Sequence, residues 1–279
     1  MLIYNQLFRF LSKYTLISII TLNSVCALQI GDKAPNFTTE STKGKLNFYD
    51  WAGKNWVIIF SHPAAFTPVC TTELATLAKL QPEFTKRKVK VVTLSADSVK
   101  DNLEWIPLIN KYKDKLILKS SLSEKITNFG KNNNVDFPIL EDENLKISTL
   151  YGMFHPKAKP NSGVFGAARK ETIRSVFIID PQKNIQTILI YPKNIGRNFN
   201  EILRIIDALK ISAKYKVSTP ANWENGHDVI VPSSMVDEAI EENYGSLTNT
   251  LDFQLFRTIK QPGSPDQKKG RNPSGPKKR

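Results

Sequence analysis

The sequence predicts an α/β fold with a mixed central sheet and helices on both of its faces. Three observations indicate this class: strand-like runs alternate with helix-like segments, one early run is apolar at every position, and a hairpin pattern follows late in the chain. A continuous apolar run is typical of a strand buried on both faces. A hairpin adds antiparallel pairing to strands that are otherwise joined through helices. The chain of 279 residues is 41% hydrophobic, enough to bury such a core.

The first elements surround a strand-to-helix junction. Residues 56–60 (Trp-Val-Ile-Ile-Phe) and residues 90–95 are predicted strands. Between them, residues 71–88 carry apolar side chains at helical spacing, and Pro82 is expected to kink or end that helix. Glu73 lies one turn into it, as an acid favoured by the positive end of the helix dipole.

The next elements are shorter. Residues 98–110 are a predicted helix with Ser98 as its N-cap. A stretch rich in Lys, Asn and Ser, 111–134, looks like a surface insertion. A short strand at 136–140 and a short helix at 144–151 follow it.

The late part of the pattern supplies the hairpin. Strands at 175–179 and 185–191 flank an Asp-Pro-Gln-Lys-Asn turn, and residues 198–210 form an amphipathic helix. Beyond residue 212 the segments are short and rich in Pro, Asn and Gly, so a small irregular C-terminal module is expected.

The N-terminal 27 residues predict a targeting segment. They contain Arg9 and Lys13 but no acid, and their apolar stretch is too short to span a bilayer comfortably. The small residues Val25 and Ala27 fit a signal-peptide cleavage site, which favours the secretory pathway or export. The lack of acids keeps a presequence for a mitochondrion or another organelle as the alternative. A leader without targeting function would leave the protein in the cytosol.

The net charge of +13 is concentrated at the ends of the chain. Residues 260–279 hold seven basic residues against one acid, a net +6, together with several Pro and Gly residues. This composition predicts a disordered, solvated basic tail. Nuclear localisation or nucleic-acid contact is the alternative, but no aromatic residue interleaves with the charges, which argues against nucleic-acid binding.

The chain has only two cysteines, Cys26 and Cys70, and its three histidines are scattered. These counts argue against a disulfide framework and a zinc site, so we expect no metal and no cofactor. Removal of the leader would also remove Cys26 and leave Cys70 as the single thiol.

Cys70 ends the run Pro-Ala-Ala-Phe-Thr-Pro-Val-Cys at the junction between a strand and a helix. The first turn of a helix offers unpaired N–H groups and a positive dipole end, which stabilise a thiolate. Thr67 lies three residues before the sulfur and Pro63 four residues before Thr67. The run therefore predicts a turn that holds a small oxygen-bearing substrate over a nucleophilic sulfur. The alternative is a buried core cysteine.

The same residues carry a family resemblance. Ser61-His62-Pro63, followed by Phe-Thr-Pro-Val-Cys-Thr-Thr-Glu at 66–73, resembles the peroxidatic Pro-x3-Thr-x2-Cys motif of peroxiredoxins. Later segments in the same order resemble the 1-Cys branch, the peroxiredoxin 6 type, over most of the chain from residue 28 to 262. They are Leu94–Ser98, Phe137–Ile139, Tyr151–Met153, Tyr191–Pro192, Gly196–Arg204 and Thr219–Trp223.

The resemblance implies a thioredoxin-like fold with a C-terminal dimerisation extension, and hence a homodimer. It implies an antioxidant peroxidase that reduces hydrogen peroxide and organic hydroperoxides. Cys70 would attack the peroxide, and Arg174, placed by the family match, would fix the sulfur and the peroxide oxygens. Thr67 would donate a hydrogen bond to the leaving oxygen, and Pro63 would screen the thiolate from water. His62 would orient the pocket, tune the cysteine or serve as a satisfied structural histidine.

A single cysteine cannot resolve its own sulfenic acid, so an external thiol such as glutathione or a thioredoxin-type donor is expected. A disulfide oxidoreductase is disfavoured because the chain has no Cys-x-x-Cys. A non-enzymatic holdase or binding role that uses the basic tail is the alternative from another class. No stable membrane span is expected.

The expected domain order has four parts. A targeting segment covers residues 1–27, a thioredoxin-like peroxiredoxin domain covers 28–195, a C-terminal extension covers 196–262 and a disordered basic tail covers 263–279.

Overall fold

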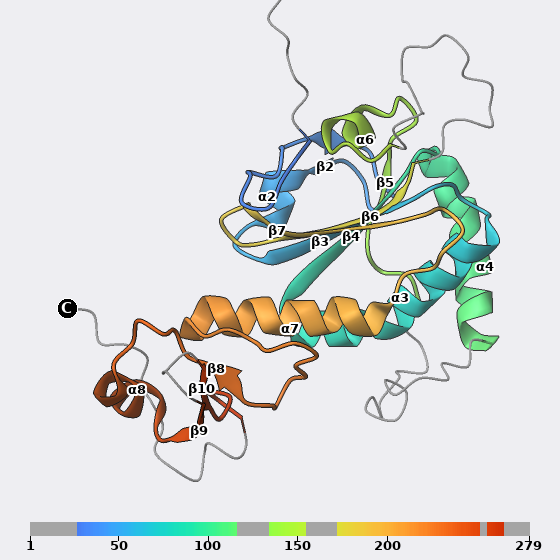
Figure 1. The fold of residues 1–279 in the computed structure, drawn as a ribbon. Coiled ribbons are helices and arrows are strands. Elements are labelled where there is room, and N and C mark those ends of the chain that lie inside the picture. The colour runs from blue at the N-terminus through green and yellow to red at the C-terminus, as the bar shows by residue number, and fades with distance from the viewer. Residues whose placement is uncertain (1–26, 116–133, 155–171, 252–255, 265–279) are drawn as a thin grey trace, which may run out of the picture.

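A mixed five-stranded sheet forms the centre of the computed structural model, with the strand order β5-β4-β3-β6-β7 (Figure 1). Strands β3 (Trp56–His62), β4 (Val89–Ser95) and β5 (Ile139–Glu141) run parallel. Strands β6 (Arg174–Ile179) and β7 (Ile185–Tyr191) form the predicted hairpin and add to β3 antiparallel. The α/β thioredoxin-like class with a mixed sheet is confirmed.

The structure describes residues 27–115, 134–154, 172–251 and 256–264. Within these residues no helix has the length and apolar character needed to cross a membrane.

Helices lie on both faces of the sheet. Three long helices, α3 (Pro68–Lys86), α4 (Val99–Lys115) and α7 (Phe199–Tyr215), pack on one face. The opposite face is covered by α2 (Phe48–Ala52) and α6 (Lys146–Leu150). A small ribbon of β1 (Thr38–Thr39) and β2 (Leu46–Asn47) precedes α2.

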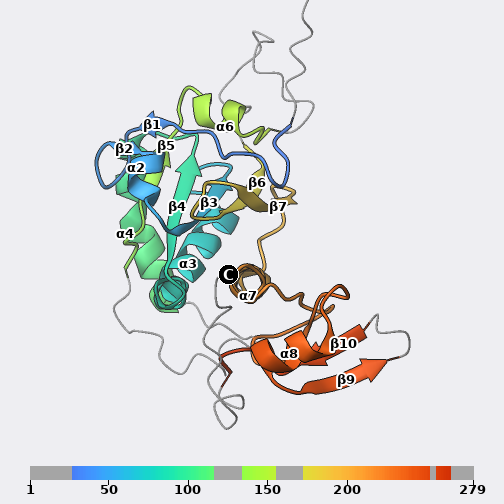
Figure 2. The ribbon, with the colours of Figure 1, turned by 90° about the vertical axis from the view of Figure 1, so that its left-hand side faces the viewer.

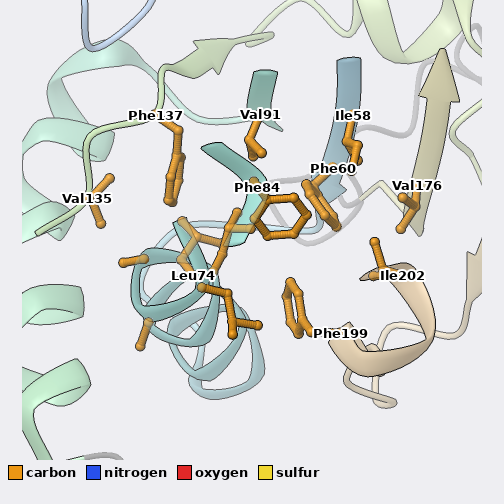
Figure 3. Packing of buried hydrophobic residues seen from close by; sticks show 14 of the residues in the cluster. Ile58, Phe60, Leu74, Phe84, Val91, Val135, Phe137, Val176, Phe199 and Ile202 are labelled. Carbon is orange, nitrogen blue, oxygen red and sulfur yellow. The ribbon is translucent and has the colours of Figure 1, made fainter. Parts of the chain in front are cut away.

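Strand β3 separates two cores because successive side chains of a strand point to opposite faces. Ile58 and Phe60 join the cluster under the long helices, whereas Val57 and Ile59 join the cluster on the other face. The Phe60 ring lies edge-on to the ring of Phe84 in α3, at 6.4 Å between centroids, and Figure 3 shows these side chains meeting between sheet and helix. This packing fixes α3 on the sheet.

The structure changes two predicted boundaries of α3. The helix begins at Pro68 rather than at residue 71, because proline suits the first helical turn, where its missing N–H has no intrahelical partner to lose. Pro82 does not end the helix, which continues to Lys86. Burial of Leu80 and Phe84 on either side of Pro82 offsets the lost backbone hydrogen bond.

Helix α4 is longer than predicted and takes in the first residues of the expected insertion. The Ser98 hydroxyl accepts a hydrogen bond from the Asp101 amide at 3.0 Å, so Ser98 is the N-cap as predicted. Near the other end, Lys113 is buried and its ammonium donates to Asn134 at 3.3 Å. The helix runs to Lys115, and the rest of the insertion, 116–133, lies outside the described residues.

The C-terminal module is more regular than predicted. It contains β8 (Val229–Ile230), α8 (Asp237–Tyr244), β9 (Leu247–Leu251) and β10 (Phe256–Ile259), with strand order β8-β10-β9. Its own small core packs on the side of α7 that faces away from the sheet (Figure 2). Short strands give weak periodicity, so the sequence pattern did not reveal them.

A buried histidine ends β3. The His62 side chain is fully buried, and neither ring nitrogen has a hydrogen-bond partner within the described residues. Burial, followed by the positive charges of Arg197 and Arg174, lowers the pKa of His62 to about 3. The folded protein therefore keeps this ring neutral at pH 7.

This histidine should make stability depend on pH. The unfolded chain protonates His62 near pH 6.5, whereas the folded chain does so only near pH 3, so the unfolded state binds more protons between these values. The free energy of unfolding should therefore fall as the pH is lowered through this range. His62→Phe removes the effect. Between pH 7 and pH 5 the free energy of unfolding of the variant should fall by about 2 kcal/mol less than that of the wild type.

Urea unfolding at both pH values measures the difference. His227→Gln, a change at an exposed histidine, serves as the control and should retain the wild-type pH dependence. Equal pH dependence in His62→Phe and in the wild type would contradict the assignment.

Candidate active site

Cys70 lies in the first turn of α3, directly after the loop that follows β3. Its side chain is fully buried and carries a free thiol. Thr67 is the N-cap residue with an extended backbone, and its carbonyl accepts the Thr71 amide at 2.9 Å. Before it, Phe66 adopts a φ of 56°, which reverses the chain between strand and helix. The loop thus delivers the sulfur to the N-terminal end of α3, as the sequence predicted.

The structure brings Arg174 to this sulfur. Arg174 begins β6, and the antiparallel pairing of β6 with β3 carries its side chain to the strand end from which α3 departs. Its Nη1 lies 3.2 Å from the Cys70 Sγ, although 104 residues separate the two in sequence. Nε and Nη2 donate to the Lys193 carbonyl at 2.8 and 2.6 Å, which fixes the plane of the guanidinium.

Glu73 is a member of the site, and the sequence did not identify its role. It lies one helical turn after Cys70 and is buried, and its Oε2 accepts from Nη1 of Arg174 at 2.7 Å. It also accepts three hydrogen bonds from Arg197, from the backbone amide, Nε and Nη2, at 2.8, 3.0 and 2.7 Å. Glu73 therefore joins two buried guanidinium groups, and its position is explained by these pairs rather than by the helix dipole.

Arg197, just before α7, is the second residue that sequence reasoning missed. Its Nη1 donates to the carbonyls of Ser61 and Ser175, and the guanidinium carbon lies 5.2 Å from the Phe60 ring centroid. The available signal was an arginine inside a motif that matched the family, next to the cap of a helix. No local pattern brings that arginine to Glu73, because the contact joins residues 124 positions apart.

The remaining predicted residues surround this centre. The Thr67 hydroxyl donates to the Ala64 carbonyl at 3.0 Å, and Pro63 is buried at the start of the loop. The His62 ring lies 5.4 Å from the ring of Trp105. Neither of its ring nitrogens has a hydrogen-bond partner among the described residues, so these residues do not supply the hydrogen bonds of a satisfied structural histidine.

The charges of the site are unequal. Arg174 and Arg197 carry two positive charges, and Glu73 carries one negative charge, all in buried positions. The neighbouring His62 is neutral at pH 7 because its pKa is lowered to about 3 by burial and by the two arginines. An excess of one positive charge thus lies next to the Cys70 sulfur, where it favours an anion.

Comparison with known proteins places the chain in a family. The AhpC/TSA family model matches residues 30–188, and the model for the C-terminal domain of 1-Cys peroxiredoxin matches residues 208–246. The mitochondrial peroxiredoxin of Saccharomyces cerevisiae is 40% identical over 233 residues, covering 84% of this chain and 82% of that protein. Human peroxiredoxin-6 is 41% identical over 211 residues, covering 76% of this chain and 86% of that protein.

Solved structures agree with these matches. A structure of the yeast mitochondrial 1-Cys peroxiredoxin superimposes with a TM-score of 0.69 at 38% identity, covering 84% of this chain and 99% of that one. A Cys-to-Ser mutant of peroxiredoxin 6 from Arenicola marina superimposes with a TM-score of 0.71 at 34% identity, covering 85% of this chain and 100% of that one. With a free cysteine under an arginine at the N-terminus of α3, this chain belongs to the 1-Cys peroxiredoxins of the AhpC/TSA family and is a thiol-dependent peroxidase.

Proposed function

We propose that Cys70 is the peroxidatic nucleophile and that Arg174 and Thr67 act on the peroxide oxygens. The substrates are hydrogen peroxide and organic hydroperoxides. The observation that carries this assignment is the 3.2 Å contact between Nη1 of Arg174 and the Cys70 sulfur at the start of a helix. A guanidinium can bind a thiolate and an oxygen together, because its donors lie in one rigid plane.

The reaction breaks the O–O bond of the peroxide. The thiolate attacks the terminal oxygen, a new S–O bond forms, and the other oxygen leaves with the electron pair of the broken bond. Protonation of the leaving oxygen gives water or an alcohol, and Cys70 becomes a sulfenic acid. The sulfur is oxidised by two electrons, and the peroxide is reduced by two.

The charge balance of the site suits a thiolate at Cys70 as the attacking group. Two guanidinium groups face one carboxylate, so a thiolate at Cys70 would complete a neutral buried set of four groups. Buried charges are costly unless they are paired and hydrogen-bonded, and here each would have partners. Glu73 keeps the two arginines together without cancelling both of them.

Thr67 has a different starting geometry from the one expected. Its hydrogen is donated to the Ala64 carbonyl, which leaves the lone pairs of the hydroxyl oxygen free to accept the O–H of an incoming peroxide. We therefore assign Thr67 an accepting role toward the bound peroxide rather than donation to the leaving oxygen.

Pro63, buried and without an N–H, keeps water from the sulfur. The neutral ring of His62 forms a wall of the pocket beside the arginines.

An external thiol returns the sulfenic acid to the thiol. The chain has no cysteine besides Cys26 and Cys70, and Cys26 would be lost with the leader. The structure of the yeast relative concerns thiol resolution via glutathione/thioredoxin systems, which supports the same classes of reductant here.

A homodimer is the proposed assembly, with the domain limits set out from the sequence. The match of residues 208–246 to the C-terminal domain of 1-Cys peroxiredoxin supports the extension. Strand β7 is an edge of the sheet, and its Ile190 is 63% exposed, which suits pairing with a second copy. Sedimentation of a monomer at micromolar concentration would count against the dimer.

The destination of the protein is proposed from its leader and a relative. The yeast relative is a mitochondrial protein, which supports the organelle presequence over the signal peptide. Residues 1–26 and 265–279 lie outside the described residues, so the roles of the leader and the basic tail stay with the sequence argument. Import of the full chain into isolated mitochondria, with removal of the leader, is the test, and exclusive export would contradict it.

Peroxide oxidation tests the catalytic assignment. Reduced protein treated with one equivalent of hydrogen peroxide should gain one oxygen on Cys70, read by intact mass, and Cys70→Ser should gain none. Arg174→Ala should slow the reaction by about 100-fold, because a charged donor to the developing oxyanion is lost. Arg204→Ala, which removes a partly exposed arginine paired with Glu201, is the control and should react at the wild-type rate. Oxidation no faster than that of a free thiol would reject the assignment.

Glu73→Gln tests the buried charge network. The variant leaves two guanidinium groups without their shared carboxylate and should lower the free energy of unfolding by about 3 kcal/mol. Glu201→Gln removes a carboxylate from a partly exposed pair and should cost less than about 1 kcal/mol. Urea unfolding of both variants gives the comparison, and equal costs would show that the network does not stabilise the fold.

The reductant is identified from the oxidised protein. Glutathione should displace water from the sulfenic acid to give a mixed disulfide at Cys70 that further glutathione resolves, whereas a thioredoxin should form a transient mixed disulfide that its own second thiol resolves. Thiol recovery followed by intact mass distinguishes the two routes. Failure of both to restore Cys70 would reject the proposed classes of reductant.

A further inference from the structure

A carboxylate outside the described network supports the loop that carries Thr67. Asp97 follows β4, which pairs in parallel with β3, so the loops that follow the two strands emerge side by side. The Oδ2 of Asp97 accepts a hydrogen bond from the backbone N–H of Ala65 at 2.6 Å, inside the loop between Pro63 and Thr67. The hydroxyl of Ser95, a buried residue paired with His62 in the sheet, donates to the same oxygen.

The two ends of one peptide group lead from Asp97 to Thr67. The N–H of Ala65 and the carbonyl of Ala64 belong to the same planar peptide unit. Asp97 binds the N–H, and the carbonyl accepts the hydrogen of the Thr67 hydroxyl at 3.0 Å. Because the peptide is planar and trans, its N–H and C=O point in opposite directions. Fixing the N–H therefore also fixes the direction in which the carbonyl meets the hydroxyl.

The charge of Asp97 strengthens this arrangement. A hydrogen bond to an ionised carboxylate is shorter and stronger than one between neutral groups. It polarises the peptide, so the Ala64 carbonyl becomes a better acceptor for Thr67. With its hydrogen held there, the Thr67 oxygen presents lone pairs in a defined direction.

We propose that Asp97 is a positioning residue that orients the Thr67 hydroxyl for peroxide binding through the Ala64–Ala65 peptide. The inference extends the proposed role of Thr67 and depends on it. Asp97 touches neither Cys70 nor Arg174 by any described hydrogen bond, so its effect should fall on peroxide binding and not on the thiolate.

Two reactions of Cys70 separate these effects. Reaction with hydrogen peroxide uses Thr67, whereas alkylation by iodoacetamide depends on the thiolate and its access. Asp97→Ala should lower the second-order rate constant for peroxide by at least about tenfold, which corresponds to about 1.4 kcal/mol. It should change the alkylation rate by less than about twofold. Asp97→Asn retains an acceptor oxygen and should restore most of the peroxide rate.

A double-mutant cycle tests the route through Thr67. Thr67→Val should lower the peroxide rate, and adding Asp97→Ala to it should cost little more, because the group that Asp97 positions is already absent. Glu141→Ala is the matched control. The Glu141 side chain also accepts a backbone N–H after a parallel strand, that of Val99 at 2.9 Å, but it does not contact the loop. This variant should keep both rates.

The outcomes decide the proposal. Equal losses in the peroxide and alkylation rates would mean that Asp97 only maintains the loop, and independent losses in the cycle would remove the link to Thr67. If Asp97→Ala does not fold, Asp97→Leu and Asp97→Asn, whose side chains have the same number of heavy atoms, give the same comparison. A normal peroxide rate in Thr67→Val would reject the proposed role of Thr67 itself. A slow Thr67→Val with a normal Asp97→Ala would reject only the positioning role.

Discussion

The carboxylate of Glu73 binds two buried guanidinium groups at once, and the geometry of the active site depends on it. Through Arg174 it is connected to β6, and through Arg197 to the segment that enters α7. Two arginines of like charge would repel each other in a buried site, and each would bear a large desolvation cost. The shared carboxylate offsets both effects and leaves one positive charge for the sulfur. Stability and reactivity thus come from the same group.

The mixed sheet makes this network possible. The parallel pairing of β3 with β4 and the antiparallel pairing of β3 with β6 bring three chain segments to one end of β3. The first turn of α3 with Cys70, the segment after β4 with Asp97 and the first residue of β6 meet there. A one-residue shift of β6 would turn Arg174 to the opposite face of the sheet, away from the sulfur. The apolar packing of Phe60 against α3 and α7 opposes such a shift.

Around the sulfur, polar groups and neutral rings have different roles. Arg174 and Thr67 are the groups that we propose to meet the peroxide, and each is held by a backbone carbonyl, that of Lys193 for Arg174 and that of Ala64 for Thr67. His62 and Trp105 form an uncharged wall, since burial and the two arginines keep the His62 ring neutral. The site therefore combines a preorganised positive centre with a low-dielectric surrounding, in which electrostatic interactions are strong.

The sequence alone determined the features that depend on near neighbours. Alternation of strand and helix periods, the Ser98 cap, the hairpin at 180–184 and the Pro-Thr-Cys spacing are all local, and the structure contains each of them. Arg174 was found only through the family resemblance, because nothing near it in the chain marks it. The tertiary structure alone decided the partners of Glu73, the place of Arg197 and the contact of Asp97 with Ala65. Each of these joins residues 32 or more positions apart, so strand register and helix packing, and not local spacing, set their distances.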